Sequence, residues 1–178
     1  MIDVLAPDEA VHAAPELGAV YLSAFGAPGY DEEPARAEEF ATEQIPLHSQ
    51  RDDFKLVVAR DAGKLTGFAY GFTGHRGQWW SDRVAAAVSP ELADEWIGGH
   101  FEVVELAVVV EAQGQGLGAE LMAALMTDLP NRKALLTTFV DDRPAPRLYR
   151  RMGWKVLVPD LGWDSALYGL DLGVPAGR

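Results

Sequence analysis

The chain has 178 residues, 48% hydrophobic and 24% charged, which is typical of one globular domain with a real core. It contains no cysteine, so disulfides, thiolate catalysis and cysteine-ligated metals are excluded. A net charge of −12 argues against nucleic acid as a partner, and no apolar run reaches membrane-spanning length. With no secretory signal at its first residues, we expect a cytoplasmic protein that acts away from membranes, with one domain over 1–178 and a frayed tail at 173–178.

The first half of the chain predicts helices followed by a β-hairpin. Its expected elements, in order, are a short strand at 2–5, a helix over 8–25 that restarts at Pro15, a helix capped by Asp31, and strands at 54–59 and 65–72. In the last of these strands aromatic and small residues alternate, so that Phe68 and Tyr70 share one face and Gly67 lies on the other. The small face suits either a closely packed helix or a ligand lying on the sheet.

The stretch from Phe101 to Leu129 organises the rest of the chain. An apolar strand at 101–110 leads into a glycine-rich turn, and a helix with one apolar face follows. Because that helix begins at the glycines, its first turn offers unpaired backbone N–H groups and the positive end of the helix dipole. Glycine also lets the backbone approach a phosphate where any Cβ would intrude, so the sequence predicts an anion site here.

One polar side chain interrupts the apolar strand. Between Val103 and Val110, only Glu105 is polar. A carboxylate in the middle of a buried strand is costly unless it has a partner or a chemical task. Glu105 is therefore either an ion-paired structural carboxylate or a functional one.

The glycine-rich turn can be compared with three phosphate-binding patterns. A Walker loop needs Lys followed by Ser or Thr after its last glycine, but Ala119 follows Gly118. A dinucleotide fingerprint needs the spacing Gly-x-Gly-x-x-Gly, whereas these glycines stand at 114, 116 and 118. The third pattern is Gln or Arg, two residues, Gly, one residue, then Gly or Ala, and Gln113, Gly116 and Gly118 fit it. Taken alone, the turn fits an ordinary strand-to-helix connection equally well.

The last third of the chain predicts a strand, a helix and two closing strands. They are expected at 133–140, at 143–152 with Asp142 as the helix cap, at 154–158 and at 166–172. In this helix Leu148, Tyr149 and Met152 share an apolar face, while four arginines fall on the other face, which we expect to be solvated.

Two segments together resemble the GNAT superfamily of N-acetyltransferases. The turn from Gln113 to Gly118 is similar to its acetyl-CoA motif. The stretch from Ala145 to Trp154 is similar to its second motif, with an alanine, an aliphatic–tyrosine pair and a glycine–aromatic pair in order. The resemblance implies an α/β fold in which helices flank a mixed, mostly antiparallel sheet whose two central strands splay apart. Here a helical insertion at 74–100, its second helix capped by Ser89, would separate the third and fourth strands.

The resemblance also implies an activity. The enzyme would move an acetyl group from acetyl-CoA to a primary amine of a small-molecule acceptor, by direct attack in a ternary complex. Tyr149 occupies the position of the general acid that protonates the departing thiolate, and Glu105 the position of the general base. The cofactor contacts would come from strand backbone at Ala107, Val108 and Val110, and from the turn residues Gln113, Gly114, Gln115, Gly116, Leu117, Gly118 and Ala119. No metal is implied, and the four histidines lack metal-ligand spacing. A homodimer is compatible with the sequence, which does not reveal whether the chain pairs with itself.

Several alternatives stay open at this point. Tyr149 also fits a core tyrosine, because it lies on the apolar face of its helix. The whole chain also fits an acyl-CoA-binding sensor or partner-binding module without turnover. The insertion at 74–100, which contains Trp79 and Trp80, either shapes the acceptor site or is an inert flap held down by tryptophan packing.

Overall fold

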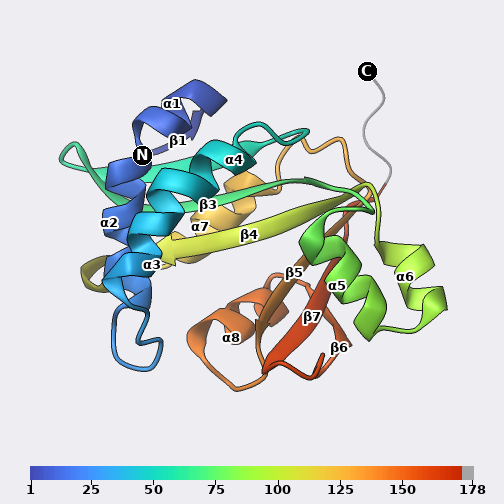
Figure 1. Cartoon of the computed structure of the whole chain (residues 1–178). Coiled ribbons are helices and arrows are strands. Elements are labelled where there is room, and N and C mark those ends of the chain that lie inside the picture. The colour runs from blue at the N-terminus through green and yellow to red at the C-terminus, as the bar shows by residue number, and fades with distance from the viewer. Residues whose placement is uncertain (174–178) are drawn as a thin grey trace. The chain divides into compact units, whose positions relative to one another are not determined.

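The computed structural model describes residues 1–173, which form two compact units. Unit 1 comprises Met1–Phe72 and Val104–Thr127, and unit 2 comprises Thr73–Val103 and the described chain from Asp128 onward. The strands follow the order β1-β2-β3-β4-β5-β7-β6, and β3 and β4 each continue from one unit into the other (Figure 1). Apart from Gly173, the predicted frayed tail at 173–178 lies outside the described residues. The prediction of a single domain stays a prediction.

Unit 1 contains the N-terminal helices, a β-hairpin and the central strand with the helix that follows it. Its strands are β1 (Ile2–Leu5), β2 (Lys55–Asp61), β3 (Lys64–Gly74) and the C-terminal part of β4 (His100–Val108). Its helices are α1 (Pro7–His12), α2 (Ala14–Phe25), α3 (Pro34–Glu39), the π-helix η1 (Phe40–Gln44), α4 (Ile45–His48), the 3₁₀ turn η2 (Val110–Ala112) and α7 (Leu117–Leu125). β2 pairs antiparallel with both β1 and β3.

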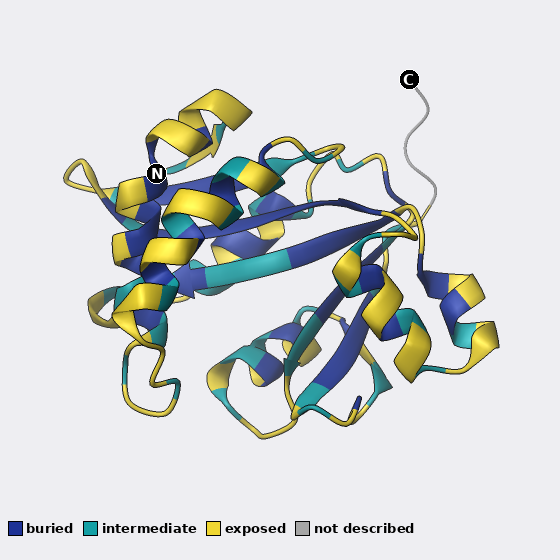
Figure 2. Cartoon of the chain, viewed as in Figure 1, coloured by how far each residue is buried: buried dark blue, intermediate teal, exposed yellow. Residues whose placement is uncertain are grey.

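The two faces of the β2–β3 hairpin carry different layers. Leu56 lies opposite Tyr70 and Val58 opposite Phe68, and these four side chains form a core with residues of α1, α2, η1 and α4. Figure 2 shows β3 buried along most of its length. On the other face, a Cβ added to Gly67 would lie 2.9 Å from Leu121 Cδ1 on α7. The small face of β3 is therefore occupied by a closely packed helix, the first of the two alternatives.

Unit 2 contains the insertion and the closing strands. Its elements are α5 (Trp79–Ala87), α6 (Pro90–Trp96), the N-terminal part of β4, β5 (Lys133–Phe139), α8 (Pro144–Arg151), β6 (Lys155–Val158) and β7 (Ser165–Asp171). β4 runs parallel to β5, with Phe101 opposite Ala134, whereas β5 and β6 both pair antiparallel with β7. Leu167 of β7 packs with the insertion helices, and its neighbour Tyr168 contacts Tyr149 of α8, so the two helical groups cover opposite faces of β7.

The predicted mixed, mostly antiparallel sheet with flanking helices is confirmed, and so is the helical insertion between β3 and β4. Ser89 caps α6 as predicted, since its hydroxyl accepts a hydrogen bond from Leu92 N–H at 3.3 Å. Pro15 does lie in the first turn of α2, where its missing N–H costs nothing.

Two predicted caps are wrong. α3 is capped at Glu33, while Asp31 uses its carboxylate to accept a hydrogen bond from Gly29 N–H at 3.3 Å. α8 begins after Arg143, and Asp142 instead pairs with the Arg150 guanidinium at 2.5 Å. In both cases the aspartate has a competing local partner. Within residues 1–173, no helix combines the length and the apolar character needed to cross a membrane.

The contact between Gly67 and α7 makes a stability prediction. Gly67→Ala should lower the free energy of unfolding by about 1–3 kcal/mol, because the added methyl group overpacks the space against Leu121 and the Ala107 carbonyl. Lys64→Ala, at an exposed position of the same strand, should stay within about 0.5 kcal/mol of wild type. Urea denaturation of the three proteins measures this. If Gly67→Ala is as stable as Lys64→Ala, α7 does not pack against this face.

Candidate functional site

The turn between β4 and α7 is built by backbone conformations that favour glycine. Gly114 has φ of 74° and Gly116, the N-cap of α7, has φ of 89°, both in the left-handed region. Within residues 1–173, no backbone N–H from Gly114 to Gly118 donates to an acceptor outside α7. Because the N–H groups at the start of a helix have no carbonyl acceptor within the helix, these groups are available to an anion.

The two glutamine side chains of the turn fold back and leave this backbone accessible. Gln113 Nε2 donates to the Val108 carbonyl at 2.9 Å, and Gln115 Nε2 donates to the Glu111 carbonyl at 3.1 Å. At the other end of α7, Lys55 Nζ donates to the carbonyls of Ala124 and Thr127, at 2.9 Å and 2.5 Å. A cation at this end complements the helix dipole, whose positive end lies at the turn.

The end of β4 is shorter than predicted. The strand stops at Val108, and Val110 lies in the 3₁₀ turn η2, where its N–H donates to Ser23 Oγ of α2 at 3.3 Å. The Ala107 carbonyl lies 3.0 Å from the point where a Cβ on Gly67 would be, so it faces β3. Because backbone groups alternate along a strand, Val108 turns its carbonyl to the opposite edge of β4. The residues predicted to contact the cofactor through strand backbone are Ala107, Val108 and Val110. Of these three, Val108 is the one that lies in β4 with its carbonyl at the edge away from β3.

Glu105 lies half-buried in the middle of β4, and charged groups of the N-terminal helical region act on its carboxyl group. Burial raises the pKa of its carboxyl group to about 8, the Arg36 guanidinium lowers it, and the Glu32 carboxylate raises it. The buried Tyr21 of α2 shares this environment, since burial and the charge of Glu105 raise the pKa of its phenol. A carboxyl group with this pKa exchanges its proton near neutral pH, which suits a general base or acid.

Tyr149 lies on α8 in unit 2, whereas Glu105 belongs to unit 1. The Tyr149 side chain is buried, with its ring centroid 6.1 Å from Trp154 and 6.2 Å from Tyr168. This aromatic packing fits the core-tyrosine alternative, and it also fixes the ring of a general acid. The arginines Arg147 and Arg150 lie on the exposed side of α8 and pair with Asp142.

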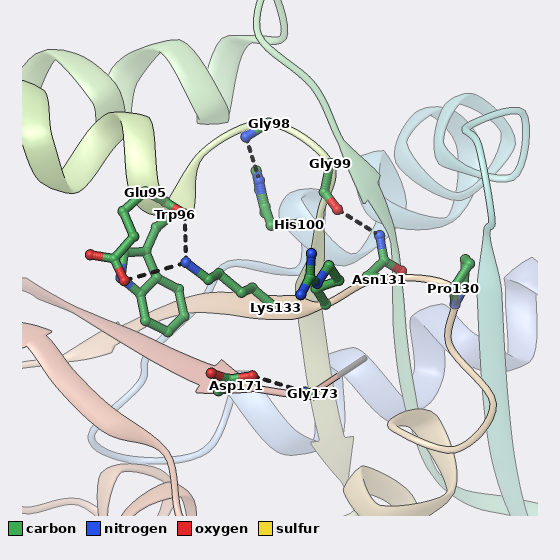
Figure 3. Close-up of a pocket in the computed structure, with 11 residues that line it drawn as sticks. Glu95, Trp96, Gly98, Gly99, His100, Pro130, Asn131, Lys133, Asp171 and Gly173 are labelled. Carbon is green, nitrogen blue, oxygen red and sulfur yellow. Dashed lines mark hydrogen bonds and ion pairs between the residues drawn. The ribbon is translucent and has the colours of Figure 1, made fainter. Parts of the chain in front are cut away.

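A hollow of about 640 Å³ lies in unit 2, but it contains none of the predicted site residues (Figure 3). Some of its polar groups engage one another: Lys133 donates to Glu95, and the Asn131 amide nitrogen donates to the Gly99 carbonyl at 2.9 Å. Among the described residues, the buried atoms His100 Nε2 and Asn131 Oδ1 have no hydrogen-bond partner. His100 accepts from Gly98 N–H at 3.1 Å, and burial lowers its pKa to about 4. We therefore place the candidate site at β4 and its turn.

The insertion residues fall into two groups. Trp96 is buried, and Trp80 packs against the same cluster, as expected for a packed flap. Trp79 is 72% exposed, with Arg83 placed 5.1 Å from its ring. The role of the insertion in binding an acceptor stays a prediction. Among the described residues, no group of three His, Asp or Glu side chains is placed to hold a metal ion.

Sequence reasoning missed Arg36, whose charge lowers the pKa of Glu105, and Tyr21, whose pKa the charge of Glu105 raises. Neither belongs to a motif, and both lie on N-terminal helices far from Glu105 in the sequence. The single available signal was Glu105 itself, because a carboxylate in an apolar strand requires charged or polar neighbours somewhere in the fold.

The raised pKa of Glu105 predicts a pH-dependent stability difference. The folded state holds a proton that the unfolded chain releases between pH 4.5 and about 8, so the free energy of unfolding falls as pH rises through this window. The Glu105→Gln variant has no carboxyl group to ionise, so its stability does not fall in this way. Above pH 8 the variant should be more stable than wild type by about 2–4 kcal/mol. This is less than ~1.4 kcal/mol for each unit of the pKa shift, because the side chain is partly accessible to solvent.

At pH 4.5 the Glu105→Gln variant and wild type should be equally stable. Urea denaturation between pH 4.5 and 9.5 measures the difference, with Glu111→Gln, an exposed residue just beyond β4, as the control. A difference that does not change with pH would show that Glu105 ionises in the folded protein as it does in the unfolded chain.

The comparisons with known proteins agree with this fold and motif. Residues 17–154 match the model of the Acetyltransferase (GNAT) family. A curated relative, a GCN5-like protein acetyltransferase of Mycobacterium tuberculosis, is 35% identical over 102 residues, which cover 53% of this chain and 50% of the relative. The chain thus spans about half the length of the curated relative that it matches.

Two solved structures show the same fold. An acetyltransferase from Thermus thermophilus has a TM-score of 0.68 at 14% identity, covering 96% of this chain and 97% of its own. The PaiA N-acetyltransferase from Thermoplasma acidophilum, solved in complex with coenzyme A, has a TM-score of 0.65 at 13% identity, covering 96% and 99%. With more than half of its length matched by the family model, the chain belongs to the acetyltransferase (GNAT) family, which is a family of enzymes.

Proposed function

We propose that this protein transfers the acetyl group of acetyl-CoA to a primary amine of a small-molecule acceptor. The observation that carries the proposal is the row of unengaged backbone N–H groups from Gly114 to Gly118, directly after β4 and at the start of α7. Oriented N–H groups at a helix start suit a pyrophosphate, and the turn residues Gly114 to Gly116 are exposed. Family membership supports the same cosubstrate.

The turn binds the pyrophosphate of the cofactor, and the strand before it binds the pantetheine. The N–H groups from Gly114 to Gly118 hold the pyrophosphate, whereas those of Gln113 and Ala119, also predicted to contact it, already donate to the Val110 and Gly116 carbonyls. A Cβ on Gly114 or Gly116 would meet no protein atom within 4 Å, so the space beside the backbone is open. The carbonyl of Val108, at the edge of β4 away from β3, is the backbone group oriented to accept from a pantetheine amide. Gln113 holds the same carbonyl and fixes the end of the strand.

Two residues of the chain move the protons. The amine nitrogen attacks the thioester carbonyl carbon in a ternary complex, a C–N bond forms, and the C–S bond breaks. Glu105 in its ionised form accepts the proton that the amine loses, directly or through water. Tyr149 gives its phenolic proton to the departing thiolate sulfur. A pKa of about 8 makes the Glu105 carboxylate a stronger base than an ordinary glutamate, although a smaller share of it is ionised at pH 7.

The acceptor class is the least determined part of the proposal. The net charge of −12 and the exposed Glu32 beside Glu105 favour a cationic acceptor. The mycobacterial relative is named a protein acetyltransferase, so a lysine side chain of a protein belongs in every acceptor panel. The contrasting function is an acyl-CoA sensor without turnover. Such a protein would bind the cofactor at the same turn, but Glu105 and Tyr149 would transfer no protons.

Cofactor binding is tested with a matched pair of glycines. Gly116 and Gly63 both have positive φ, 89° and 82°, and neither has a protein atom within 4 Å of an added Cβ. Gly116→Ala and Gly63→Ala therefore carry similar backbone strain of about 1–2 kcal/mol, and only the first places a methyl group at the candidate anion site. We expect calorimetry to show CoA binding by wild type and Gly63→Ala, and at least tenfold weaker binding by Gly116→Ala. Equal affinity of the two variants would remove the turn from the site.

The chemistry is tested by thiol release from acetyl-CoA with a panel of small amines, aminoglycosides and lysine peptides. Tyr149→Phe should lower kcat by roughly 10²–10⁴ with the best acceptor and change acetyl-CoA affinity little, because a positioned acid is lost. Tyr168→Phe, its buried ring neighbour on β7, is the control and should keep wild-type kcat. Binding of CoA without thiol release for any acceptor would favour the sensor, and wild-type kcat in Tyr149→Phe would exclude the tyrosine as the acid.

A further inference from the structure

The C-terminal end of α8 is closed by a glycine cap that involves Tyr149. Gly153 has φ of 87°, in the left-handed region, and a Cβ on it would meet no protein atom within 4 Å. Trp154 N–H donates to the Tyr149 carbonyl at 3.1 Å, and Gly153 N–H donates to the Arg150 carbonyl at 3.2 Å. These two hydrogen bonds are those of a Schellman motif, which satisfies carbonyls that the helix itself leaves without a donor.

The cap brings the indole of Trp154 against the phenol ring of Tyr149. In a Schellman motif, the residue after the left-handed glycine frequently contacts the side chain of the residue whose carbonyl it binds. Here the two ring centroids are 6.1 Å apart, with an angle of 57° between the ring planes. Both side chains are buried, since Trp154 is 3% and Tyr149 is 7% exposed. The backbone turn and the ring contact therefore fix the same pair of residues.

A second aromatic ring, from β7, contacts Tyr149. The ring centroid of Tyr168 lies 6.2 Å from that of Tyr149, with an angle of 62° between the planes, an edge-to-face arrangement that aromatic pairs favour. Trp154 is followed directly by β6, whose Val156 lies opposite Tyr168 on β7. Tyr149 is thus bounded by one ring from the cap of its own helix and by one ring from the sheet.

The indole nitrogen of Trp154 contributes no hydrogen bond to this arrangement. Nε1 is buried, and it has no hydrogen-bond partner among the described residues. A buried donor without an acceptor costs free energy, so the indole stabilises this region through its ring contacts alone. Replacing the indole by a phenyl ring removes no hydrogen bond, which makes Trp154→Phe a variant that keeps a ring at this position.

We propose that Trp154 is a positioning residue of the acetyl transfer: the Gly153 cap places its indole on Tyr149, and together with Tyr168 it holds the phenol in the orientation from which the proton reaches the departing thiolate. The inference rests on the proposed role of Tyr149 as the general acid. A general acid must lie within hydrogen-bond reach of the atom that it protonates, and a displacement of about 1 Å can lower a rate by about 100-fold. Trp154 transfers no proton itself and acts through Tyr149.

Steady-state thiol release tests this with Trp154→Leu, which removes the ring but keeps an apolar side chain. The kcat should fall by about 10–100-fold, because the phenol is no longer held in place, while the KM for acetyl-CoA should stay within about twofold of wild type. Trp154→Phe, which keeps a ring beside Tyr149, should recover most of the kcat. In the Tyr149→Phe background, Trp154→Leu should lower kcat no further, because the hydroxyl that it positions is already absent.

Trp96 provides a matched control. It is another buried tryptophan of unit 2, 8% exposed, but it packs with the insertion helices and Leu167, on the face of β7 away from Tyr168. Trp96→Leu should lower the melting temperature, as Trp154→Leu does, and should keep the wild-type kcat. Kinetics are measured at a temperature at which melting curves show every variant folded. An equal fall in kcat in the two tryptophan variants would overturn the inference.

A pair of glycine variants tests the cap without removing a buried ring. Gly153 and Gly162 have φ of 87° and 90°, and neither has a protein atom within 4 Å of an added Cβ. Gly153→Ala and Gly162→Ala therefore carry similar backbone strain, but only the first strains the turn that places Trp154. The kcat should fall by about 2–10-fold in Gly153→Ala and stay at the wild-type value in Gly162→Ala. Equal kcat in these two variants would exclude the cap from the reaction.

A further readout does not need turnover. The protein has five tyrosines, and with ¹³C-labelled tyrosine the Tyr149 ring signal is assigned by its absence in Tyr149→Phe. Its relaxation should report a more mobile ring in Trp154→Leu and an unchanged ring in Trp96→Leu. Wild-type kcat in Trp154→Leu, or an equal loss of kcat with and without the Tyr149 hydroxyl, would overturn the inference while the proposed function stands. Absence of thiol release by the wild type with every acceptor would overturn the proposed function, whatever the mobility of the ring.

Discussion

Glu105 places a carboxyl group inside an apolar strand, and the surrounding elements must either supply charge to compensate its ionised form or hold it protonated. Ionised, Glu105 needs compensating charge; protonated, it needs none. The structure lies between these limits, because burial raises the pKa to about 8 and the Arg36 guanidinium opposes the rise. α2 and α3 supply Tyr21 and Arg36 at this place, so the N-terminal helices are linked to the centre of β4 by electrostatics as well as by apolar packing.

The sequence predicted the parts of the site that depend on local signals. The helix after the central strand begins at Gly116, as the glycine spacing indicated, and its N–H groups are accessible. The insertion helices and the Ser89 cap were also predicted, because a cap needs only a hydroxyl three residues from a free N–H. The alternation in β3 indicated a close neighbour at Gly67, and α7 proved to be that neighbour. Each of these signals lies within a few residues of the feature that it predicts.

Features that depend on distant residues could not be predicted in this way. β4 stops at Val108 and Val110 turns away, because its N–H reaches Ser23 on α2. The π-helix that presents Gln44 to Tyr70 has no recognisable pattern, since its reason lies on another element. Aspartate is a favourable helix cap, but the Asp31 carboxylate accepts a hydrogen bond from Gly29 N–H instead of capping α3. Residue type gives the capacity to bond, and the fold decides the partner.

Lys55 lies at the opposite end of α7 from the glycine-rich turn, so the helix dipole relates the two ends. Its ammonium group closes the C-terminal end of α7, where it meets the negative end of the dipole at the Ala124 and Thr127 carbonyls. A helix of nine residues is about 13 Å long, so the dipole of α7 spans the short distance between Lys55 of β2 and the candidate anion site at the turn. If the dipole couples the two ends of α7, an anion that strengthens the lysine contact is itself bound more tightly, by the same factor. Occupancy of the candidate anion site would thus be felt as added rigidity in the β2–β3 hairpin.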